Sequence, residues 1–218
     1  ILSHLLDVIK KYSIDIALPF HDAAIPLLAD LSNYVFVPTC DNSLVNTFTS
    51  KISSGKFFRD NLLPTPPYST EVPVIAKPNF GSASKGILKF FDQDTLNKFL
   101  NDPKSINYEF QKLYSGPEYS VDGYVALNSN FHHFAIRERL ETLGGEAVKS
   151  LTVEISDIQN ICNKIKDIRG VRGAITIQFI FDNQLKNYGL MEINPRYGGG
   201  VLTSLYAGVP WFHILLRD

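Results

Sequence analysis

The chain has 218 residues, which is enough for one large domain or two small ones with a buried core. Apolar residues make up 44% and charged residues 20%, and 21 Lys and Arg against 22 Asp and Glu leave a net charge of −1. This balance excludes a disordered or fibrous chain and predicts no nucleic-acid partner, while no apolar run approaches the roughly 18 residues of a membrane span.

The cysteine pattern and the first residues favour a cytoplasmic location. Cys40 and Cys162 lie far apart and form no CxxC pair, so neither a zinc site nor a disulfide framework is indicated. The opening segment lacks the basic start and small-residue cleavage site of a secretory signal. Because the first residue is Ile1 and the last apolar helix runs to the final residues, we expect both ends to lie within a longer protein.

The first 45 residues alternate helical and strand patterns. Residues 1–12 are amphipathic, residues 14–20 and 34–38 read as short buried strands, and Asp22 is expected to cap a helix through Leu31. Consecutive parallel strands need a crossover element, so this order predicts part of a Rossmann-like domain. The alternative is a compact two-strand lobe, which we favour less because both strands would lack neighbours.

The next segment divides at a proline-rich stretch. Residues 41–61 predict a helix or a helix pair, and residues 62–73 hold four prolines that exclude a helix interior and mark a boundary. A small β-β-α-β block then spans residues 72–114. Its strands are expected at residues 72–78, 87–91 and 106–114, and its helix at residues 95–100, capped by Asp92 or Asp94.

From Glu118 the pattern changes to long antiparallel strands. These are expected at residues 119–127, 131–143, 148–155, 174–182 and 187–195, with the last two forming a hairpin around Asn183. Residues 157–169 predict a helix with one isoleucine-rich face, and residues 201–216 predict terminal helices. The chain as a whole therefore predicts an α+β fold.

The strongest chemical signal is a set of polar residues on the last hairpin. Glu192 and Asn194 differ by two positions and share one face, and Gln178 on the facing strand reaches that face. One carboxylate and two amide oxygens suit Mg²⁺, and Arg196 adds a fork for phosphate or carboxylate oxygens. A solvent-facing polar stripe is the alternative. The proline and three glycines that follow argue against it, because they favour backbone that approaches a ligand.

Two further segments suggest nucleotide binding. Lys77 ends a predicted strand before a loop of small residues, 79–86, whose backbone N–H groups could bind phosphates, although the Walker spacing is absent. Glu118 follows a Gly-Pro turn, where it could accept hydrogen bonds from ribose hydroxyls beside an adenine edge. The alternatives are an exposed hairpin loop and an exposed turn glutamate. Lys51 alone is typical of a solvated helix lysine.

Together and in this order, these motifs resemble the ATP-grasp superfamily, and most closely its branch of carbamoyl-phosphate-synthase large-subunit-like carboxylate–amine ligases. The resemblance implies an α/β sandwich of two lobes that clamp ATP. Residues 1–45 would belong to a Rossmann-like pre-ATP-grasp domain and residues 46–218 to the ATP-grasp domain, with 72–114 as a small lid lobe and 115–218 as a large antiparallel-sheet lobe. The implied reaction activates a carboxylate as an acyl phosphate, which an amine then attacks.

The resemblance also implies roles for individual residues, with ATP and Mg²⁺ or Mn²⁺ as cofactors. Phosphates would be bound by Lys51 and Lys77 and covered by Gly81, Ser82, Ser84, Lys85 and Gly86. Adenine would be bordered by Gln111, Lys112 and Leu113, and the ribose by Glu118. One or two metal ions would be held by Gln178, Glu192 and Asn194, and the catalytic cations would be Arg196 and Lys77.

The sequence departs from the family pattern at three positions and leaves the partners open. Lys112 and Gln178 stand where the family more often has acids, and Ser50 stands where it has Asp. The small-molecule carboxylate is expected near Arg137, Arg139 and Arg196, the alternative for the first two being exposed strand positions. The three histidines at 132, 133 and 213 show no ligand spacing. A non-catalytic nucleotide-binding module and a kinase-like phosphotransferase remain as other functions, and a homodimer is one option for assembly.

Overall fold

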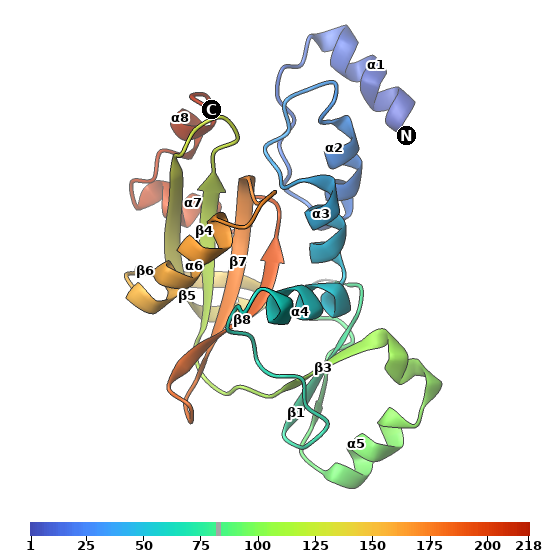
Figure 1. Ribbon diagram of the computed structural model, residues 1–218. Helices are drawn as coiled ribbons and strands as arrows, with labels where there is room; N and C mark the ends of the chain where they lie inside the picture. Colours follow the sequence, from blue (N-terminus) through green and yellow to red (C-terminus); the bar gives the residue numbers. More distant parts are fainter. Residues whose placement is uncertain (82–83) are drawn as a thin grey trace.

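The fold contains two separate antiparallel sheets, and a helical N-terminal segment lies alongside the larger one (Figure 1). The structure is a computed structural model that describes residues 1–81 and 84–218. None of the helices in this described part is long and apolar enough to cross a bilayer. Cys40 and Cys162 are both buried and free.

The N-terminal segment contains α1 (Leu2–Tyr12), the 3₁₀ helix η1 (Asp22–Ala24) and α2 (Ile25–Leu31). The prediction of two buried strands was wrong, because their described residues form only one parallel bridge, between Ile16 and Phe36. The parallel direction is confirmed by the bond from the Ala17 N–H to the Phe36 carbonyl, at 2.9 Å. No further strand of the described residues pairs with this bridge, so it does not extend into a sheet.

The helix pair expected after residue 41 is confirmed as α3 (Asn42–Thr49) and α4 (Lys51–Asp60). Ser50 separates them in an extended conformation, and its hydroxyl accepts a hydrogen bond from the Ser53 N–H at 3.1 Å. The same hydroxyl donates to the Asn79 side chain at 2.6 Å. Ser50 therefore caps α4 and also ties its start to the loop that follows the first strand.

The small sheet follows the proline-rich stretch, which forms no helix, and it confirms the β-β-α-β prediction. Its strands run in the order β2-β1-β3, all antiparallel, with η2 before the last strand. Asp92, rather than Asp94, caps the helix by accepting from the Thr95 N–H at 2.8 Å. The elements are β1 (Val74–Pro78), β2 (Leu88–Phe90), α5 (Gln93–Leu100), η2 (Pro103–Asn107) and β3 (Tyr108–Lys112).

The large sheet confirms the antiparallel strands predicted after residue 118. Its order is β6-β5-β4-β7-β8, so the last hairpin forms one edge and the pair β5 and β6 forms the other. Two short helices, α7 (Val201–Tyr206) and α8 (Trp211–Leu215), end the described chain. The strands are β4 (Glu118–Val125), β5 (His132–Leu143), β6 (Glu146–Val153), β7 (Gly173–Asp182) and β8 (Asn187–Asn194).

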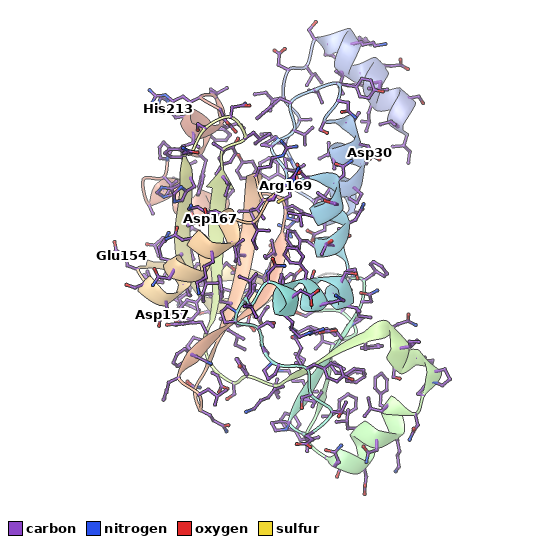
Figure 2. The ribbon with its side chains drawn as sticks, in the orientation of Figure 1. Asp30, Glu154, Asp157, Asp167, Arg169 and His213 are labelled. Carbon is purple, nitrogen blue, oxygen red and sulfur yellow. The ribbon has the colours of Figure 1, made fainter. Side chains whose placement is uncertain are left out.

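The two faces of the large sheet differ in chemistry. One face is apolar and packs beneath α3, α4 and α6 (Ser156–Lys166), with Val121, Ile177 and Ile158 fully buried in the same cluster. The outer side of α6 and its flanks carry the exposed Glu154, Asp157 and Asp167 (Figure 2). Strand alternation places the intervening polar residues of β4, β5 and β7 on the opposite face. This polar face is the floor of the candidate site.

A bulge in the last hairpin sets the phase of β8. Gln178 pairs with Glu192 and Phe179 pairs with Leu190, so Met191 is the extra residue on β8. Leu190 and Ile193 therefore both enter the apolar cluster, while Glu192 is released to the polar face. The local irregularity thus serves both the core and the site.

The N-terminal segment is fastened where β7 begins and β8 ends. Gly173 has a φ of +73°, and a Cβ there would lie 2.2 Å from the carbonyl carbon of Pro38. The Thr39 hydroxyl donates to the Pro195 carbonyl at 2.7 Å, and the Tyr197 N–H donates to the Pro19 carbonyl at 3.0 Å. These contacts bring residues 19–22 to the edge of the polar face.

Candidate functional site

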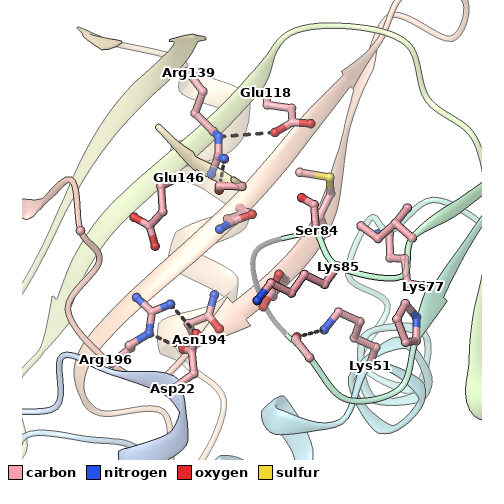
Figure 3. A pocket seen from close by; sticks show the side chains of 18 of the residues that line it. Asp22, Lys51, Lys77, Ser84, Lys85, Glu118, Arg139, Glu146, Asn194 and Arg196 are labelled. Atoms are coloured by element: carbon pink, nitrogen blue, oxygen red, sulfur yellow. Dashed lines mark hydrogen bonds and ion pairs between the residues drawn. The ribbon is translucent and has the colours of Figure 1, made fainter. Parts of the chain in front are cut away.

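A cavity of about 410 Å³ lies between the small sheet, the N-terminal segment and the polar face of the large sheet (Figure 3). Its described walls are rich in charge of both signs. They contain the acids Asp22, Glu118, Glu146 and Glu192, and the bases Lys51, Lys77, Lys85, Arg139 and Arg196. Such a site suits a polyanionic ligand together with groups that balance its charge.

The three oxygen-bearing residues predicted on the last hairpin line this cavity together. Gln178 and Glu192 are paired across β7 and β8, and Asn194 lies two residues further along β8. Among the described residues no group of three His, Cys, Asp or Glu side chains could hold a metal. One carboxylate and two amide oxygens nevertheless fit Mg²⁺, which takes hard oxygen ligands and completes its shell with waters and substrate phosphates. Metal binding by these three residues stays a prediction.

Lys77 enters the cavity from the end of β1 and is held by the neighbouring strand. Its Nζ donates to the Gln111 Oε1 at 2.8 Å, and Gln111 is only 3% exposed. Burial lowers the pKa of Lys77, an effect that the negative charge of Glu192 opposes and the positive charge of Lys51 reinforces. Gln111 therefore holds the ammonium at the cavity wall, where an anion bound in the cavity would favour its charged form.

The residues predicted beside adenine do not line the cavity in the described part of the chain. Gln111 instead supports Lys77. The N–H groups of Lys112 and Leu113 donate to the carbonyls of Pro67 and Pro73, each at 2.9 Å. These bonds fix the junction between β3 and the proline-rich segment, and contact with a base stays a prediction.

The predicted phosphate loop reaches the cavity through Gly81, Ser84 and Lys85. Lys51, at the first turn of α4, donates from its Nζ to the Gly81 carbonyl at 2.7 Å. Gly86 has a φ of +75° and packs near Pro78, outside the cavity wall. Ser82, which the sequence also assigned to this loop, lies outside the described residues.

Arg139 and Glu118 face each other on the polar side of β5 and β4. The Arg139 Nε lies 3.4 Å from the Glu118 Oε2, and its Nη2 donates to the Gly145 carbonyl at 2.6 Å. The alternative of an exposed strand position is wrong for Arg139, whose side chain is 6% exposed. Both residues line the cavity, so Glu118, proposed for ribose, meets a guanidinium there.

Arg137 fits neither the expected contact with a substrate carboxylate nor the alternative of an exposed strand position. It is 2% exposed, and it donates to the Asp122 carboxylate from Nε at 2.7 Å and from Nη2 at 3.1 Å. A Cβ on Gly200 would lie 2.2 Å from the Arg137 Nη2, so the guanidinium lies directly beneath the glycine run. Its fork is engaged within the protein, which makes Arg137 a support of the site.

Arg196 lies at the cavity edge and forms an ion pair that the sequence analysis missed. Its Nε and Nη2 donate to the two carboxylate oxygens of Asp22, the second at 3.0 Å, and its Nη1 donates to the Tyr197 carbonyl at 3.1 Å. The predicted capping role of Asp22 was wrong, because the His21 ring accepts from the Ala23 N–H instead. The available signal was position, since Asp22 follows a predicted strand end, where α/β sheets bind ligands.

Glu146 is the second residue that the sequence analysis missed. It is the first residue of β6, directly after the Gly144–Gly145 turn, and it lines the cavity near Arg139 and Arg196. The only signal in the sequence was an acid beside a glycine turn. The glycine run at residues 198–200, which was predicted to approach a ligand, is also favoured by packing within the protein. A Cβ on Gly199 would lie 2.6 Å from the Glu146 Oε2.

Comparison with known proteins identifies the family. Residues 110–218, half of the chain, match the family described as ATP-grasp in the biosynthetic pathway with Ter operon. The carbamoyl phosphate synthase large chain of Clostridium botulinum (strain Alaska E43 / Type E3) is 31% identical over 156 residues. That match covers 63% of this chain but only 14% of the relative.

Solved structures share the fold at low identity. Biotin carboxylase from Campylobacter jejuni superposes with a TM-score of 0.78 at 11% identity, covering 96% of this chain and 55% of that one. The biotin carboxylase domain of Hydrogenobacter thermophilus 2-oxoglutarate carboxylase gives 0.72 at 16% identity, with 89% and 51% covered. The L-amino acid ligase from Bacillus licheniformis gives 0.68 at 15% identity, with 92% and 54% covered. The chain thus spans about half the length of these solved chains.

These findings confirm the resemblance and the fold class that the motifs implied. The mixed helices and antiparallel sheets have the arrangement seen in the solved relatives. The chain belongs to the ATP-grasp superfamily.

Proposed function

We propose that this chain binds Mg-ATP in the cavity and contributes the phosphoryl-transfer site of an ATP-dependent carboxylate–amine ligase. The main support for this proposal is that Lys51, Lys77 and Lys85 line the same cavity as the oxygen donors of the last hairpin and Arg196. In this proposal residues 72–114 are the lid lobe, residues 115–218 the large lobe, and residues 1–45 part of the preceding domain.

Each charged or polar side chain of the cavity has a proposed role in binding Mg-ATP. The three lysines would bind the triphosphate, while Gln178, Glu192 and Asn194 would hold one or two Mg²⁺ or Mn²⁺ ions. A bound metal ion would neutralise charge on the phosphate oxygens. Glu118 would contact the ribose and would then exchange its contact with Arg139 for one with the sugar hydroxyls.

The proposed reaction has two steps. A carboxylate oxygen attacks the γ-phosphorus, the bond to the bridging oxygen breaks, and ADP leaves. The amine nitrogen then attacks the acyl carbon, the bond to phosphate breaks, and the nitrogen loses its proton to solvent. Phosphoryl transfer depends mainly on alignment and charge neutralisation, so Lys77 and Arg196 are proposed as the catalytic cations and no general base is assigned. Arg196 would act through its charge, because Asp22 already accepts from its guanidinium fork.

The named relatives support this class of reaction. The Bacillus licheniformis protein is an L-amino acid ligase, and the Clostridium botulinum relative is a carbamoyl phosphate synthase large chain. The Hydrogenobacter thermophilus structure was solved with MgADP and bicarbonate. A small carboxylate as the activated substrate, with an amine as the second substrate, is consistent with these descriptions.

A second function is a nucleotide-binding module without catalysis. It is favoured by the donor set, in which Glu192 is the one carboxylate and Gln178 stands where a second acid would strengthen metal binding. A module of this kind would bind Mg-ATP but would not release ADP in response to any acid.

The test compares ADP release by the full-length protein with and without added acids and amines. Wild-type protein should release ADP only when an acid is present, and Glu192→Ala should abolish that release. Glu141→Ala is the matched control, because Glu141 is exposed and paired with Lys149 on the surface. Absence of stimulation by any acid, despite nucleotide binding, would favour the binding module. Phosphorylated product without amide would indicate a kinase.

A further inference from the structure

The N-terminal segment contacts the candidate site where the chain enters η1. The Tyr197 N–H donates to the Pro19 carbonyl at 3.0 Å, and the ring of Phe20 stacks on the ring of Tyr197 with centroids 5.3 Å apart. Phe20 and Asp22 both line the cavity. The N-terminal segment thus packs against the residue that directly follows Arg196, the proposed catalytic cation.

One of these contacts is a bidentate ion pair between Asp22 and Arg196. The Nε and Nη2 groups of Arg196 donate to the two carboxylate oxygens of Asp22, the second at 3.0 Å, and Figure 3 shows this pair beside Asn194. A bidentate pair fixes the plane of a guanidinium as well as its position. The Tyr197 carbonyl accepts from Nη1 at 3.1 Å. Of the five N–H groups of the guanidinium, these contacts use three and leave two for a ligand.

Arg196 has other acids in the same cavity. Glu118, Glu146 and Glu192 also line it, yet within residues 1–81 and 84–218 Arg196 forms its ion pair with Asp22 and with none of these three. An arginine side chain is long, and a loosely held guanidinium would be attracted to Glu192, which the proposed metal ion also needs. Asp22 comes from outside the large sheet, so it holds the cation at the cavity edge and leaves Glu192 available to the metal.

We propose that Asp22 is a positioning residue for phosphoryl transfer, which acts by fixing the guanidinium of Arg196 where negative charge spreads onto the transferred phosphate. This inference rests on the proposed ligase function and adds to it a role for the N-terminal segment. Fixed charges stabilise a transition state best when they are held in place before the reaction. A misplacement of about 1 Å costs about 100-fold in rate, so the ion pair matters to the reaction although Asp22 acts only through Arg196.

The first test removes the charge of Asp22 and keeps its volume. Asp22→Asn should lower kcat for acid-stimulated ADP release by about 10- to 100-fold, with KM for ATP near wild type. The sign of the change is informative, because loss of a nearby carboxylate would by itself strengthen the attraction between Arg196 and phosphate. Asp22→Glu, which restores the charge, should regain part of the lost kcat. Asp30→Asn is the matched control, since Asp30 is exposed on α2 of the same segment (Figure 2).

A second test asks whether Asp22 acts on the guanidinium itself. In Arg196→Ala the Asp22 carboxylate remains beside the space that the side chain leaves, so added guanidinium ion should bind there and restore part of kcat. Asp22→Asn in the Arg196→Ala background should need about tenfold more guanidinium for the same recovery, the effect of losing a charge-assisted hydrogen bond. Tetramethylammonium, a cation without N–H groups, should restore activity in neither variant.

Several results would overturn the inference alone. These are an unchanged or higher kcat in Asp22→Asn, an equal loss in Asp30→Asn, and an equal guanidinium requirement with and without the Asp22 carboxylate. Loss of the Mg-ATP-induced rise in the thermal midpoint of Asp22→Asn would also overturn it, by assigning Asp22 to nucleotide binding or to the fold. If no acid stimulates ADP release by wild-type protein while Mg-ATP still raises its thermal midpoint, the ligase proposal fails and this inference fails with it.

Discussion

The buried ion pair between Asp122 and Arg137 connects the stability of the large sheet to the candidate site. Both residues are 2% exposed, and the Ser204 hydroxyl, which is fully buried, also donates to the Asp122 carboxylate. Arg137 in turn lies beneath Gly200 and donates to the Ser150 hydroxyl at 3.0 Å. The pair therefore supports the backbone that leads from Arg196 into α7.

Asp122→Asn removes the negative charge while it keeps the side-chain volume. The guanidinium of Arg137 is then left buried without a counter-ion, and removal of one partner from a buried pair costs about 3–5 kcal/mol. For a chain of this length 1 kcal/mol lowers the thermal midpoint by about 2–4 °C, so the expected decrease is about 6–20 °C. The exposed pair of Glu141 and Lys149 provides the control, because Glu141→Gln should cost less than about 1 kcal/mol.

The assays are thermal unfolding, which measures this decrease, and urea unfolding, both followed by tryptophan fluorescence. Trp211 is the single tryptophan and is 3% exposed, in a cluster with Tyr124 on the same strand as Asp122. The unfolding midpoint should decrease for Asp122→Asn with an unchanged slope, which indicates lost stability without a change in exposed surface. Equal midpoints for Asp122→Asn and Glu141→Gln would refute the assignment of a strong buried pair.

The remaining predictions concern the cavity and the N-terminal segment. Burial lowers the pKa of Lys77 in the folded protein below its ordinary 10.5. At pH values between the folded pKa and 10.5 the unfolded chain binds more protons than the folded one, so the free energy of unfolding should rise with pH in that range. Urea titrations at stepped pH should show this rise in wild-type protein and not in Lys77→Met. Gly173→Ala should free the N-terminal segment, since its Cβ meets the Pro38 backbone, and limited proteolysis within residues 13–41 should accelerate; an unchanged cleavage rate would contradict this. Asp22→Ala should lower kcat for ADP release in wild-type protein but not further in Arg196→Ala, whereas additive losses would show that Asp22 acts independently.

Sequence patterns predicted the elements that obey strong local rules. The strands after residue 118 alternate apolar and polar residues, and α6 shows its isoleucine face, so period and turn signals sufficed. The hairpin stripe could be predicted because Glu192 and Asn194 share a face whatever the register of the bulge. The two short N-terminal strands were predicted wrongly. An apolar run forms a ladder only when a neighbouring strand is present, and that depends on tertiary structure.

The site itself was predictable only in part. Lys77, Glu192 and Asn194 stand in motifs with their own spacing, whereas Asp22 reaches Arg196 across 174 positions of sequence. Burial of the arginines on β5 depended on partners on other strands, since Asp122 and Glu118 belong to β4. No local pattern contains such pairings, which arise when the sheet brings distant polar residues to one face.

The most direct test of the central claim is nucleotide binding at the cavity. Mg-ATP at about 100 times its dissociation constant should stabilise wild-type protein by about 2.7 kcal/mol and raise the thermal midpoint measurably. Lys77→Met and Glu192→Gln should each lose most of this shift, because they lie on opposite walls of the same cavity, while Glu141→Gln should retain it. A full nucleotide-induced shift in both cavity variants would contradict the placement of the triphosphate between Lys77 and Glu192.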